Sequence, residues 1–491
     1  MATFFDYLRF QAASNPNAPV IVHPRGVVEY RQLLKGSLAA ASHIVGNGFK
    51  QGDILALRVQ QPELHCCMII GAMLTGVATV SLGARGARAD DIGAAAFVYD
   101  DKPDGDWARP FQISQSWVKT ENPEGKKALT TPPRDCVSRI IYTSGTTGAT
   151  KAVPFTEEQL LARVWAQVVG LRPPLGPSRS LSMMGLMSGA GFTNMMLTFM
   201  TGGALFLGFE SANAPLSLAL YNLDRLMASP MQLMKFVRLL REKRVNLPSL
   251  KSLVVGGSRL SPQLARQAQT EVCRNLICLY GSTEMGVVAT APAEAIVNHE
   301  GAAGYIVPGV TVEVVDANHM PLGPNKEGLI RIRVPNAPTR YANDTEASRT
   351  AFRDGWFYPG DVGRVSEDGL LSLAGRESER LNAAGVKVAP SVIEDVVMDW
   401  PGIVDVAAFE HLNDMGMGEI AIAVVPEGKL DQQALAKFCR ERLRECGPRR
   451  ILLVKEVPRN EMGKIDRAGL QRTAKQAFAL KAAQTGAQPP T

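Results

Sequence analysis

The sequence contains a run of glycines and hydroxyl residues that ends on a lysine, a combination suited to binding a polyphosphate. The run TSGTTGATK covers 143–151 and directly follows the apolar stretch RIIY at 139–142. Glycine permits close backbone approach, so successive N–H groups can converge on an anion. The hydroxyls add donors, and the lysine adds a positive charge. The predicted phosphate-binding residues are Thr143, Ser144, Gly145, Thr146, Thr147, Gly148 and Lys151.

This loop differs from the Walker A pattern, in which a glycine immediately precedes the lysine. Thr150 occupies that place here. A Ser/Thr-rich surface turn is the alternative interpretation. The apolar run before the loop and the lysine at its end favour a phosphate site.

The elements around the loop are predicted from patterns of apolar residues. Short β-rich runs at 138–143, 252–255 and 420–425 alternate with apolar helical stretches, which is typical of an α/β fold. A helix is predicted over 391–399 and a further strand over 404–409.

Changes in composition along the chain indicate its domain organisation. The stretch 98–135 is rich in Asp, Lys, Pro and Gly and is interpreted as a surface connection, whereas 300–374 has short strands separated by turns. A chain of 491 residues exceeds the size of one hydrophobic core. We predict a large N-terminal domain of α/β subdomains with a small β-rich subdomain at 1–376, and a smaller, mobile α+β C-terminal domain at 377–491.

The apolar stretch at 66–82 is long enough to raise the question of a membrane span. Gly71 and Gly76 interrupt it, and the β-prone run ATVSL follows. We therefore expect a buried helix that turns into a buried strand, with no membrane span.

Charge and cysteine content exclude several classes of protein. The 53 basic and 47 acidic residues are interspersed, and the net charge of +6 forms no basic stripe, so no nucleic-acid partner is expected. The 7 cysteines include no CxxC pair and no zinc-site spacing. The N-terminal stretch shows no secretory signal. A reducing, cytoplasmic location is expected.

With TSGTTGATK as its phosphate loop, the sequence resembles the adenylate-forming (AMP-binding) superfamily of acyl-CoA synthetases, beetle luciferases and nonribosomal-peptide adenylation domains. Further motifs follow in that superfamily's order up to Arg467, and the sequence is most similar to the acyl-CoA synthetases. The stretch VGGSRL at 255–260 resembles the strand and turn beside adenine. This resemblance implies nucleotide-binding roles for Gly256, Gly257 and Ser258.

The stretch LYGSTEMG at 279–286 resembles the superfamily's signature for nucleotide and metal. Tyr280, followed by Gly281, offers a flat face for a purine. Thr283 offers a hydroxyl for the α-phosphate, and Glu284 a hard oxygen ligand for Mg²⁺. Taken alone, the same residues also fit a strand end followed by a helix cap.

Two later motifs complete the resemblance. The stretch YPGD resembles the segment whose aspartate, here Asp361, binds the ribose hydroxyls, and Arg376 matches an arginine that contacts ribose or phosphates. The stretch PRNEMGKIDR at 458–467 resembles the segment with the catalytic lysine, here Lys464. A cation is needed there because carboxylate and phosphate are both negative. The expected catalytic residues are Lys464, Thr283 and Glu284.

The resemblance implies a two-step reaction. ATP activates a carboxylic acid as its acyl-AMP, and a thiol, coenzyme A or a carrier protein, then takes the acyl group. The C-terminal domain of relatives rotates between the steps, and the thiol enters near Gly385. The usual hinge residue is an aspartate or lysine, whereas this chain has Ser378.

The predicted acyl pocket lacks charge. Relatives often have an aromatic residue and a histidine where this chain has Leu186 and Met187. The aspartate that binds an amino-acid ammonium is also missing, so we expect an uncharged hydrophobic or aromatic monocarboxylate. The expected pocket residues are Met184, Met187, Gly257, Met285 and Val287, with Met183, Gly185, Gly256 and Val288 beside them. The alternative for these Met and Val residues is ordinary core.

Four functions therefore stay open from the sequence. The first is an acid:CoA ligase with ATP, Mg²⁺ and coenzyme A. The second is a stand-alone enzyme that loads a carrier-protein thiol, and the third is a non-catalytic nucleotide-binding homologue. A luciferase-like oxidation is the fourth, without a specific feature in its favour.

Overall fold

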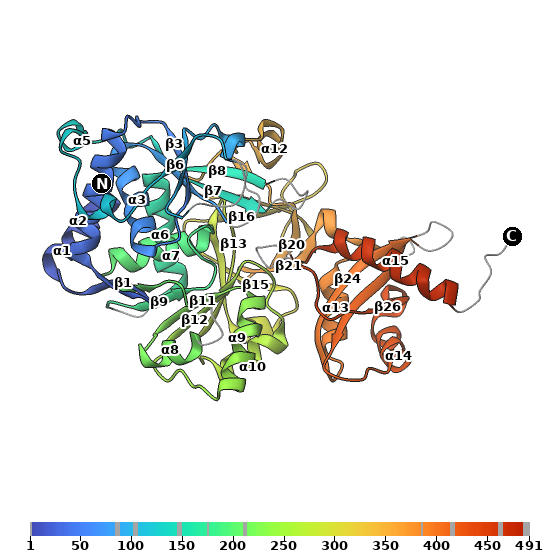
Figure 1. Cartoon of the computed structure of the whole chain (residues 1–491). Helices are drawn as coiled ribbons and strands as arrows, with labels where there is room; N and C mark the ends of the chain where they lie inside the picture. The colour runs from blue at the N-terminus through green and yellow to red at the C-terminus, as the bar shows by residue number, and fades with distance from the viewer. Residues whose placement is uncertain are drawn as a thin grey trace. The chain divides into compact units, whose positions relative to one another are not determined.

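A computed structural model of the protein describes residues 2–83, 89–101, 107–144, 150–173, 176–209, 214–383, 386–412, 418–459 and 465–484. The chain divides into two compact units (Figure 1). The first unit comprises Met1–Glu313, Arg331–Pro359 and Glu367–Leu371. The second unit comprises Val314–Ile330, Gly360–Ser366 and Ser372–Thr491. The domain boundary between 376 and 377 stays a prediction.

One sheet of the first unit carries the predicted phosphate loop. Its strands are parallel except for the antiparallel pair of β7 and β8, whose connection is that loop. The strand order is β6 (Pro110–Gln112), β5 (Ala96–Tyr99), β3 (Ile54–Arg58), β4 (Ala78–Ser81), β7 (Val137–Ser144) and β8 (Thr150–Thr156).

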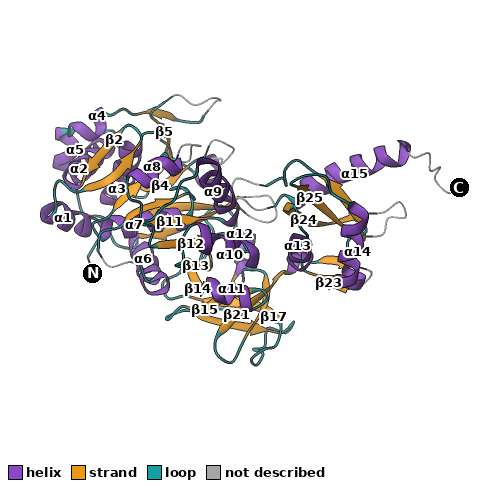
Figure 2. Cartoon of the chain, turned by 90° about the horizontal axis from the view of Figure 1, so that it is seen from below, coloured by secondary structure: helices purple, strands orange, loops and turns teal. Residues whose placement is uncertain are grey.

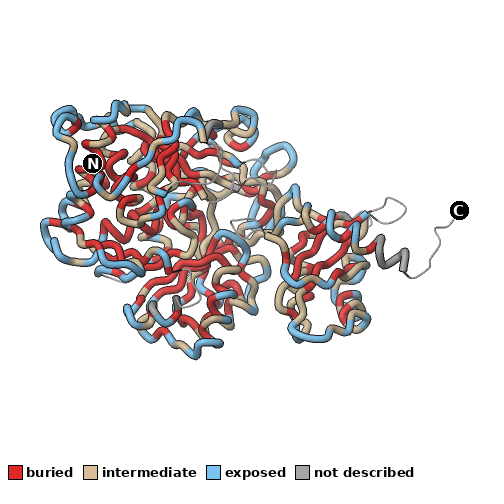
Figure 3. The backbone as a smooth tube through the Cα atoms, viewed as in Figure 1, coloured by how far each residue is buried: buried red, intermediate tan, exposed pale blue. Residues whose placement is uncertain are grey.

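A second sheet of the first unit has a parallel centre. Its strands β9, β11, β12 and β13 are parallel neighbours, so their carboxyl ends meet at one edge, where ligands bind in open α/β sheets. From β15 to its far edge, the strand order of this sheet is β15 (Ala302–Ile306), β14 (Gly286–Pro292), β13 (Leu276–Ser282), β12 (Ser252–Gly256), β11 (Arg225–Ala228), β9 (Arg179–Ser182), β10 (Ala204–Phe206), β1 (Pro19–His23) and β2 (Gly26–Glu29). The central strands are buried (red in Figure 3).

Local sequence fixes the starts of the helices in this unit. Thr156 and Ser229 each form a capping box, in which the side chain accepts from the backbone three residues on and a glutamine returns the bond. The α-helices before residue 300 are α1 (Phe4–Ser14), α2 (Tyr30–Gly46), α3 (Pro62–Thr75), α4 (Ser116–Lys119), α5 (Pro123–Ala128), α6 (Glu157–Leu171), α7 (Gly189–Met200), α8 (Ala214–Leu220), α9 (Pro230–Lys243), α10 (Pro262–Glu271) and α11 (Ala293–Asn298).

The apolar stretch at 66–82 forms the buried helix α3 and the buried strand β4, as predicted. Gly76 ends the helix with a left-handed backbone at φ 70°. Gly71, however, does not interrupt it. A Cβ at Gly71 would lie 2.8 Å from the backbone nitrogen of Ala41, so this glycine lets α2 and α3 pack closely. Of the helices in the described residues, none has the length and apolar character needed to cross a membrane.

The interpretation of 98–135 as a surface connection is wrong in part. This stretch contributes the strand β6, which extends the sheet beside β5, and two short helices. Trp117 and Val118 are buried. Charged and proline residues surround these few apolar anchors, so the average composition concealed them.

The β-rich stretch predicted at 300–374 is present, with one helix inside it. Asp344 caps this helix by accepting from the backbone of Ala347. Besides β15, the elements are β16 (Thr311–Val315), β17 (Gly328–Arg333), α12 (Thr345–Ala351), β18 (Phe352–Arg353), β19 (Trp356–Phe357), β20 (Asp361–Val365) and β21 (Leu370–Arg376).

The second unit is organised around a sheet with helices on both faces (Figure 2). Val406 and Ala408 of β24 pack toward α13 and α14, whereas Ala407 and Phe409 pack toward α15. This alternation follows from the two-residue period of a strand. The elements are η2 (Glu377–Glu379), β22 (Leu381–Ala383), β23 (Val386–Val388), α13 (Pro390–Met398), β24 (Ile403–Leu412), β25 (Gly418–Pro426), α14 (Gln432–Leu443), η3 (Arg444–Cys446), β26 (Arg450–Leu453) and α15 (Arg467–Gln484). The predicted α/β class, with a smaller C-terminal region, is confirmed.

Candidate active site

The predicted phosphate loop connects two paired strands. Thr143 lies opposite Lys151, and Ser144 lies opposite Thr150, in the antiparallel pair of β7 and β8. The stem therefore places a hydroxyl residue and a cation side by side at the loop's base. The predicted loop residues Gly145, Thr146, Thr147 and Gly148 lie outside the described residues.

A segment distant in sequence docks against this stem. The backbone of Ala342 donates to the carbonyl of Ala152 at 2.7 Å. Asn343 Oδ1 accepts from the backbone of Ala152 at 2.8 Å, and Asn343 Nδ2 donates to the carbonyl of Thr150 at 3.0 Å. The side chain of Asn343 thus binds one backbone N–H and one backbone carbonyl at the start of β8.

Tyr341, in the same segment, joins two of the predicted site residues. Its hydroxyl donates to Glu284 Oε1 at 2.7 Å, and Lys151 Nζ lies 5.0 Å from the centre of its ring. The structure thereby brings the phosphate-loop lysine and the predicted metal ligand to opposite parts of one aromatic side chain. Sequence reasoning missed Tyr341 and Asn343. The only signal was the helix-capping pattern NDTE at 343–346, which begins at Asn343 itself.

A tight hairpin presents Thr283 and Glu284 between β13 and β14. A Cβ at Gly281 would lie 1.9 Å from the carbonyl oxygen of Gly286, so the turn requires glycine at position 281. Ser282 Oγ accepts from the backbone of Met285 at 3.1 Å. These contacts fix the turn, and Tyr280 immediately precedes it on β13.

Glu284 is a buried carboxylate without a cationic partner among the described residues. Its residue exposure is 7%, and its hydrogen-bond donor is the neutral hydroxyl of Tyr341. Arg163 instead donates to the carbonyl of Thr283 at 2.7 Å. Burial lowers the pKa of Arg163 to about 10, while the charge of Glu284 acts in the opposite direction.

The chemistry of this carboxylate fits Mg²⁺. A buried charge is costly unless a cation balances it, and Mg²⁺ in nucleotide sites takes one or two carboxylates together with phosphate oxygens and water. No group of three or more His, Cys, Asp or Glu side chains within the described ranges could hold a metal by itself. Glu284 is therefore suited to a metal that arrives with a triphosphate.

The predicted adenine turn follows a strand next to the one that carries Tyr280. Gly256 ends β12, and Gly257 has φ 90°, a backbone region that favours glycine. Ser258 is exposed after it. A Cβ at Gly257 would lie 2.9 Å from Met184 Cε, so these two predicted pocket residues are in contact range.

The other predicted pocket residues lie in different surroundings. Met285 and Val287 are buried, and Val287 Cγ1 lies 3.4 Å from where a Cβ of Gly170 would be, on helix α6. Met187 is 42% exposed. It lines a cavity of about 330 Å³ together with Arg58, Val59, Gln60, His65, Leu82 and Gly83.

A buried arginine that was not singled out from the sequence contacts Ser81 and Leu186, which precede the cavity-lining Leu82 and Met187 in the chain. Arg139 is fully buried on β7. Its guanidinium donates to Thr79 Oγ1 at 3.0 Å, to Ser81 Oγ at 2.7 Å and to the carbonyl of Leu186 at 3.2 Å. Burial lowers its pKa to about 9. Arg139 therefore ties the phosphate-loop strand to the segment before α7, and a charged residue within an apolar strand run was its sequence signal.

His65 shares the hydroxyl that Arg139 uses. Its Nε2 lies 2.7 Å from Ser81 Oγ. Burial, with a smaller contribution from the charge of Arg139, lowers the pKa of His65 to about 3. The imidazole is consequently neutral at physiological pH.

The second unit contains the remaining predicted site residues. Arg376 Nε lies 3.2 Å from Asp361 Oδ1, so the structure pairs the two residues predicted to contact the nucleotide. The backbone of Glu377 donates to the carbonyl of Gly360 at 3.0 Å and holds the two segments together. Gly385 and Lys464 lie outside the described residues.

The sequence profile of the family described as AMP-binding enzyme matches residues 8–342. The chain belongs to the AMP-binding enzyme family. This family member is 28% identical to a 2-succinylbenzoate–CoA ligase of Geobacillus kaustophilus, over 96% of this chain and 98% of the relative. It is 26% identical to the long-chain-fatty-acid–CoA ligase FadD13 of Mycobacterium tuberculosis, over 93% and 96% of the two chains.

Solved structures support the fold of this AMP-binding family member. The O-succinylbenzoate coenzyme A synthetase of Bacillus subtilis in complex with AMP superposes with a TM-score of 0.82 at 20% identity, over 95% of this chain and 98% of that chain. An anthranilate CoA ligase in complex with anthranoyl-AMP gives a TM-score of 0.85 at 19% identity, over 97% and 98%. At these identities the likeness concerns the fold alone. The predicted membership of the adenylate-forming superfamily is confirmed.

Proposed function

We propose that this AMP-binding family member is an ATP-dependent carboxylic acid:CoA ligase that acts on a hydrophobic or aromatic monocarboxylate. The observation that carries the proposal is the buried Glu284, which lacks a cationic partner among the described residues and is joined through Tyr341 to Lys151 at the phosphate-loop stem. The two CoA ligases to which the chain is similar support this activity.

In the first step, a carboxylate oxygen of the acid bonds to the α-phosphorus of ATP, and the bond from that phosphorus to pyrophosphate breaks. The products are acyl-AMP and pyrophosphate. Lys464 bridges the two anions and stabilises the charge that develops between them, and Thr283 donates to the α-phosphate. Lys151 and the phosphate loop hold the triphosphate. Glu284 would hold Mg²⁺, which neutralises phosphate charge when bound.

In the second step, the thiolate sulfur of coenzyme A bonds to the acyl carbonyl carbon, and AMP leaves with the bonding electrons. We assign residues 377–491 to a mobile lid that withdraws Lys464 and lets the thiol enter near Gly385. Asp361 and Arg376 hold the ribose and phosphates of the nucleotide, while Tyr280 and the turn at 256–258 contact adenine.

The acyl pocket in this proposal centres on Met184 and Gly257, with Met187, Met285 and Val287 in its surroundings. Met184 lies close enough to Gly257 that a side chain at position 257 would displace it and change the shape of the pocket. The long-chain fatty acids named for one of the relatives agree with an apolar pocket.

We place the reaction in the cytoplasm. All of the cysteines are free thiols, which agrees with a reducing compartment.

The deciding experiment measures pyrophosphate release from ATP and Mg²⁺ with benzoate, phenylacetate or decanoate, with and without coenzyme A. We expect release that depends on the acid and continues as turnover only with coenzyme A. Lys464→Ala should abolish release but retain ATP binding. If acid-dependent release does not respond to coenzyme A, the acceptor is instead a carrier-protein thiol. If the protein binds ATP but releases no pyrophosphate under any condition, it is a non-catalytic nucleotide-binding homologue.

A further inference from the structure

Arg163 of helix α6 contacts the turn that carries Thr283 and Glu284. Its Nη1 donates to the carbonyl of Thr283 at 2.7 Å. A Cβ at Gly286, where β14 begins, would lie 3.4 Å from the same nitrogen. The guanidinium therefore lies against both ends of the turn between β13 and β14.

Two other elements confine this guanidinium. Its Cζ lies 4.9 Å from the centre of the Phe155 ring on β8, a cation–π contact. At the start of α7, a Cβ at Gly189 would lie 3.2 Å from Nη2 of Arg163 and 3.6 Å from Cγ2 of Thr283. A glycine at position 189 thus leaves room for both side chains. Arg163 consequently joins β8, α6 and the start of α7 to the turn.

Arg163 forms no ion pair with a carboxylate in the part of the chain that the structure describes. The charge of Glu284 acts on it only at longer range. Its Nε is buried and has no hydrogen-bond partner among the described residues. Burial lowers the pKa of Arg163 to about 10, because desolvation disfavours the charged form. Arg163 therefore supports the turn through a backbone carbonyl and does not neutralise Glu284 by an ion pair.

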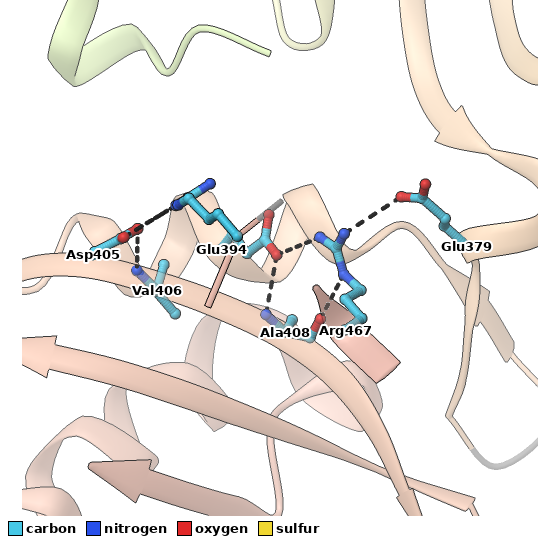
Figure 4. A network of polar contacts seen from close by, with 7 residues as sticks. Glu379, Glu394, Asp405, Val406, Ala408 and Arg467 are labelled. Atoms are coloured by element: carbon cyan, nitrogen blue, oxygen red, sulfur yellow. Dashed lines mark hydrogen bonds and ion pairs between the residues drawn. The ribbon is translucent and has the colours of Figure 1, made fainter. Parts of the chain in front are cut away.

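Arg467 in the second unit shows how the chain satisfies another sheltered guanidinium. Its Nε donates to the carbonyl of Ala408 at 2.9 Å, and its Nη2 lies 2.7 Å from Glu394 Oε1. Its Nη1 lies 3.4 Å from Glu379, so the side chain lies between two glutamates (Figure 4). Arg163 has instead a single hydrogen bond, to a neutral carbonyl, among the described residues. A desolvated charge with so few partners lowers stability. The place of Arg163 is thus better explained by the geometry of the turn than by stability.

We propose that Arg163 is a positioning residue that holds the turn with Thr283 and Glu284 in the orientation needed for adenylation. This inference rests on the proposed function, in which Thr283 donates to the α-phosphate and Glu284 would hold Mg²⁺. A displacement of about 1 Å near the reacting atoms can cost about 100-fold in rate, so a turn without this support should adenylate more slowly. The desolvated charge disappears with the side chain, so stability should not fall in parallel.

The test compares two substitutions of arginine by methionine in the first unit. Arg163→Met keeps an unbranched apolar stem but removes the charge and the hydrogen bond. Arg179→Met is the control, because the exposed Arg179 also donates from Nη1 to a backbone carbonyl, that of Tyr221, at 2.7 Å. Pyrophosphate release with benzoate or decanoate gives kcat and the KM values. Calorimetry gives the Kd of ATP with Mg²⁺ in the absence of acid, and thermal unfolding gives Tm.

We expect Arg163→Met to lower kcat about tenfold, with the KM for the acid and the Kd of ATP each within about threefold of the unchanged protein. Its Tm should stay within about 2 °C or rise. Arg163→Lys, which keeps a charge and a donor, should recover part of kcat, and Arg179→Met should leave kcat unchanged. An unchanged kcat in Arg163→Met would overturn the inference. A higher KM for the acid at normal kcat would also overturn it and assign Arg163 to the acyl pocket.

A second variant keeps the arginine and its charge. Gly189→Ala places a methyl group against Nη2 of Arg163 and Cγ2 of Thr283, and alanine is a better helix former than glycine. We expect kcat to fall about threefold without a lower Tm. The control is Gly323→Ala, whose Cβ would meet nothing within 4 Å. If Arg163→Met did not fold, a normal kcat in Gly189→Ala would overturn the inference.

Failure of the proposed function would look different. In that case the unchanged protein would bind ATP with Mg²⁺ in the calorimeter but release no pyrophosphate with either acid. Failure of the positioning role alone leaves acid-dependent release in the unchanged protein and the same kcat in the variants.

Discussion

Glu284 in the first unit and Glu394 in the second are both shielded from solvent, but their partners differ. Glu284 receives a hydrogen bond from the neutral hydroxyl of Tyr341, whereas Glu394 is paired with the guanidinium of Arg467. Burial raises the pKa of Glu394, and Arg467 acts in the opposite direction. The negative charge of Glu394 is therefore balanced within the protein. The carboxylate of Glu284 forms no ion pair with a described residue, although the charge of Arg163 interacts with it at longer range, and it is therefore the one suited to an incoming cation.

The largest effect is expected from Glu284→Gln, which removes the charge but keeps the shape. Loss of a charge-stabilising group of this kind should lower acid-dependent pyrophosphate release by about 10²–10³-fold. Stability should change by less than about 1 kcal/mol, since the lost charge has no ion-pair partner. Steady-state release and urea unfolding measure the two quantities. Wild-type release by this variant would remove Glu284 from the metal site.

Glu394→Gln should give the reverse pattern. It leaves the guanidinium of Arg467 largely buried with one fewer anion, so the free energy of unfolding should fall by about 2–3 kcal/mol. Urea unfolding measures this loss, with Asp399→Asn as the control for an exposed pair. A change no larger than that of the control would show that Glu394 is not the structural carboxylate of the comparison.

Tyr341→Phe tests the hydrogen bond that orients Glu284. A group that orients a metal ligand contributes about tenfold to metal affinity or more, so the Mg²⁺ concentration for half-maximal release should rise by about that factor. The ring that faces Lys151 is retained, so the KM for ATP should change less. A magnesium titration at saturating ATP measures the effect. An unchanged titration would mean that the carboxylate is oriented without this hydroxyl.

The smallest effect is expected from Gly257→Ala, and Gly309→Ala is its matched control. Both glycines have φ 90°, but only the Cβ at position 257 would meet a side chain, that of Met184 at 2.9 Å. Both variants should lose about 1–2 kcal/mol of stability from the left-handed backbone. Only Gly257→Ala should raise the KM for the acid, by about threefold, through displaced Met184. Equal KM values for the acid in both variants would show that Met184 does not line the acyl site.

Local patterns in the sequence predicted the elements that carry the site. The predictions of a β-run before the phosphate loop, a strand at 252–255 and a helix over 391–399 correspond to β7, β12 and α13, and all three came from periodicity and flanking residues. The contacts of Tyr341 with Lys151 and Glu284 could not be predicted in this way, because they join segments that no local pattern relates. The burial of Arg139 was also hidden, since its partners are ordinary hydroxyls and a carbonyl.

Composition misled the interpretation in two places. Averages over 98–135 concealed β6 and the buried Trp117, and Gly71 looked like a helix breaker although it permits the close contact of α2 with α3. The pairing of Arg376 with Asp361 was likewise not predictable from the sequence. The resemblance implied a nucleotide contact for each residue but no contact between the two. In each case the deciding information is which surfaces meet in three dimensions.

The place of Tyr341 between an ammonium group and a carboxylate makes its ring a natural spectroscopic reporter. Its hydroxyl touches Glu284 and its ring faces Lys151, so any occupant that engages either charge alters the electric field across one chromophore. An ultraviolet difference spectrum, corrected with the phenylalanine variant, would therefore follow nucleotide arrival without an added label.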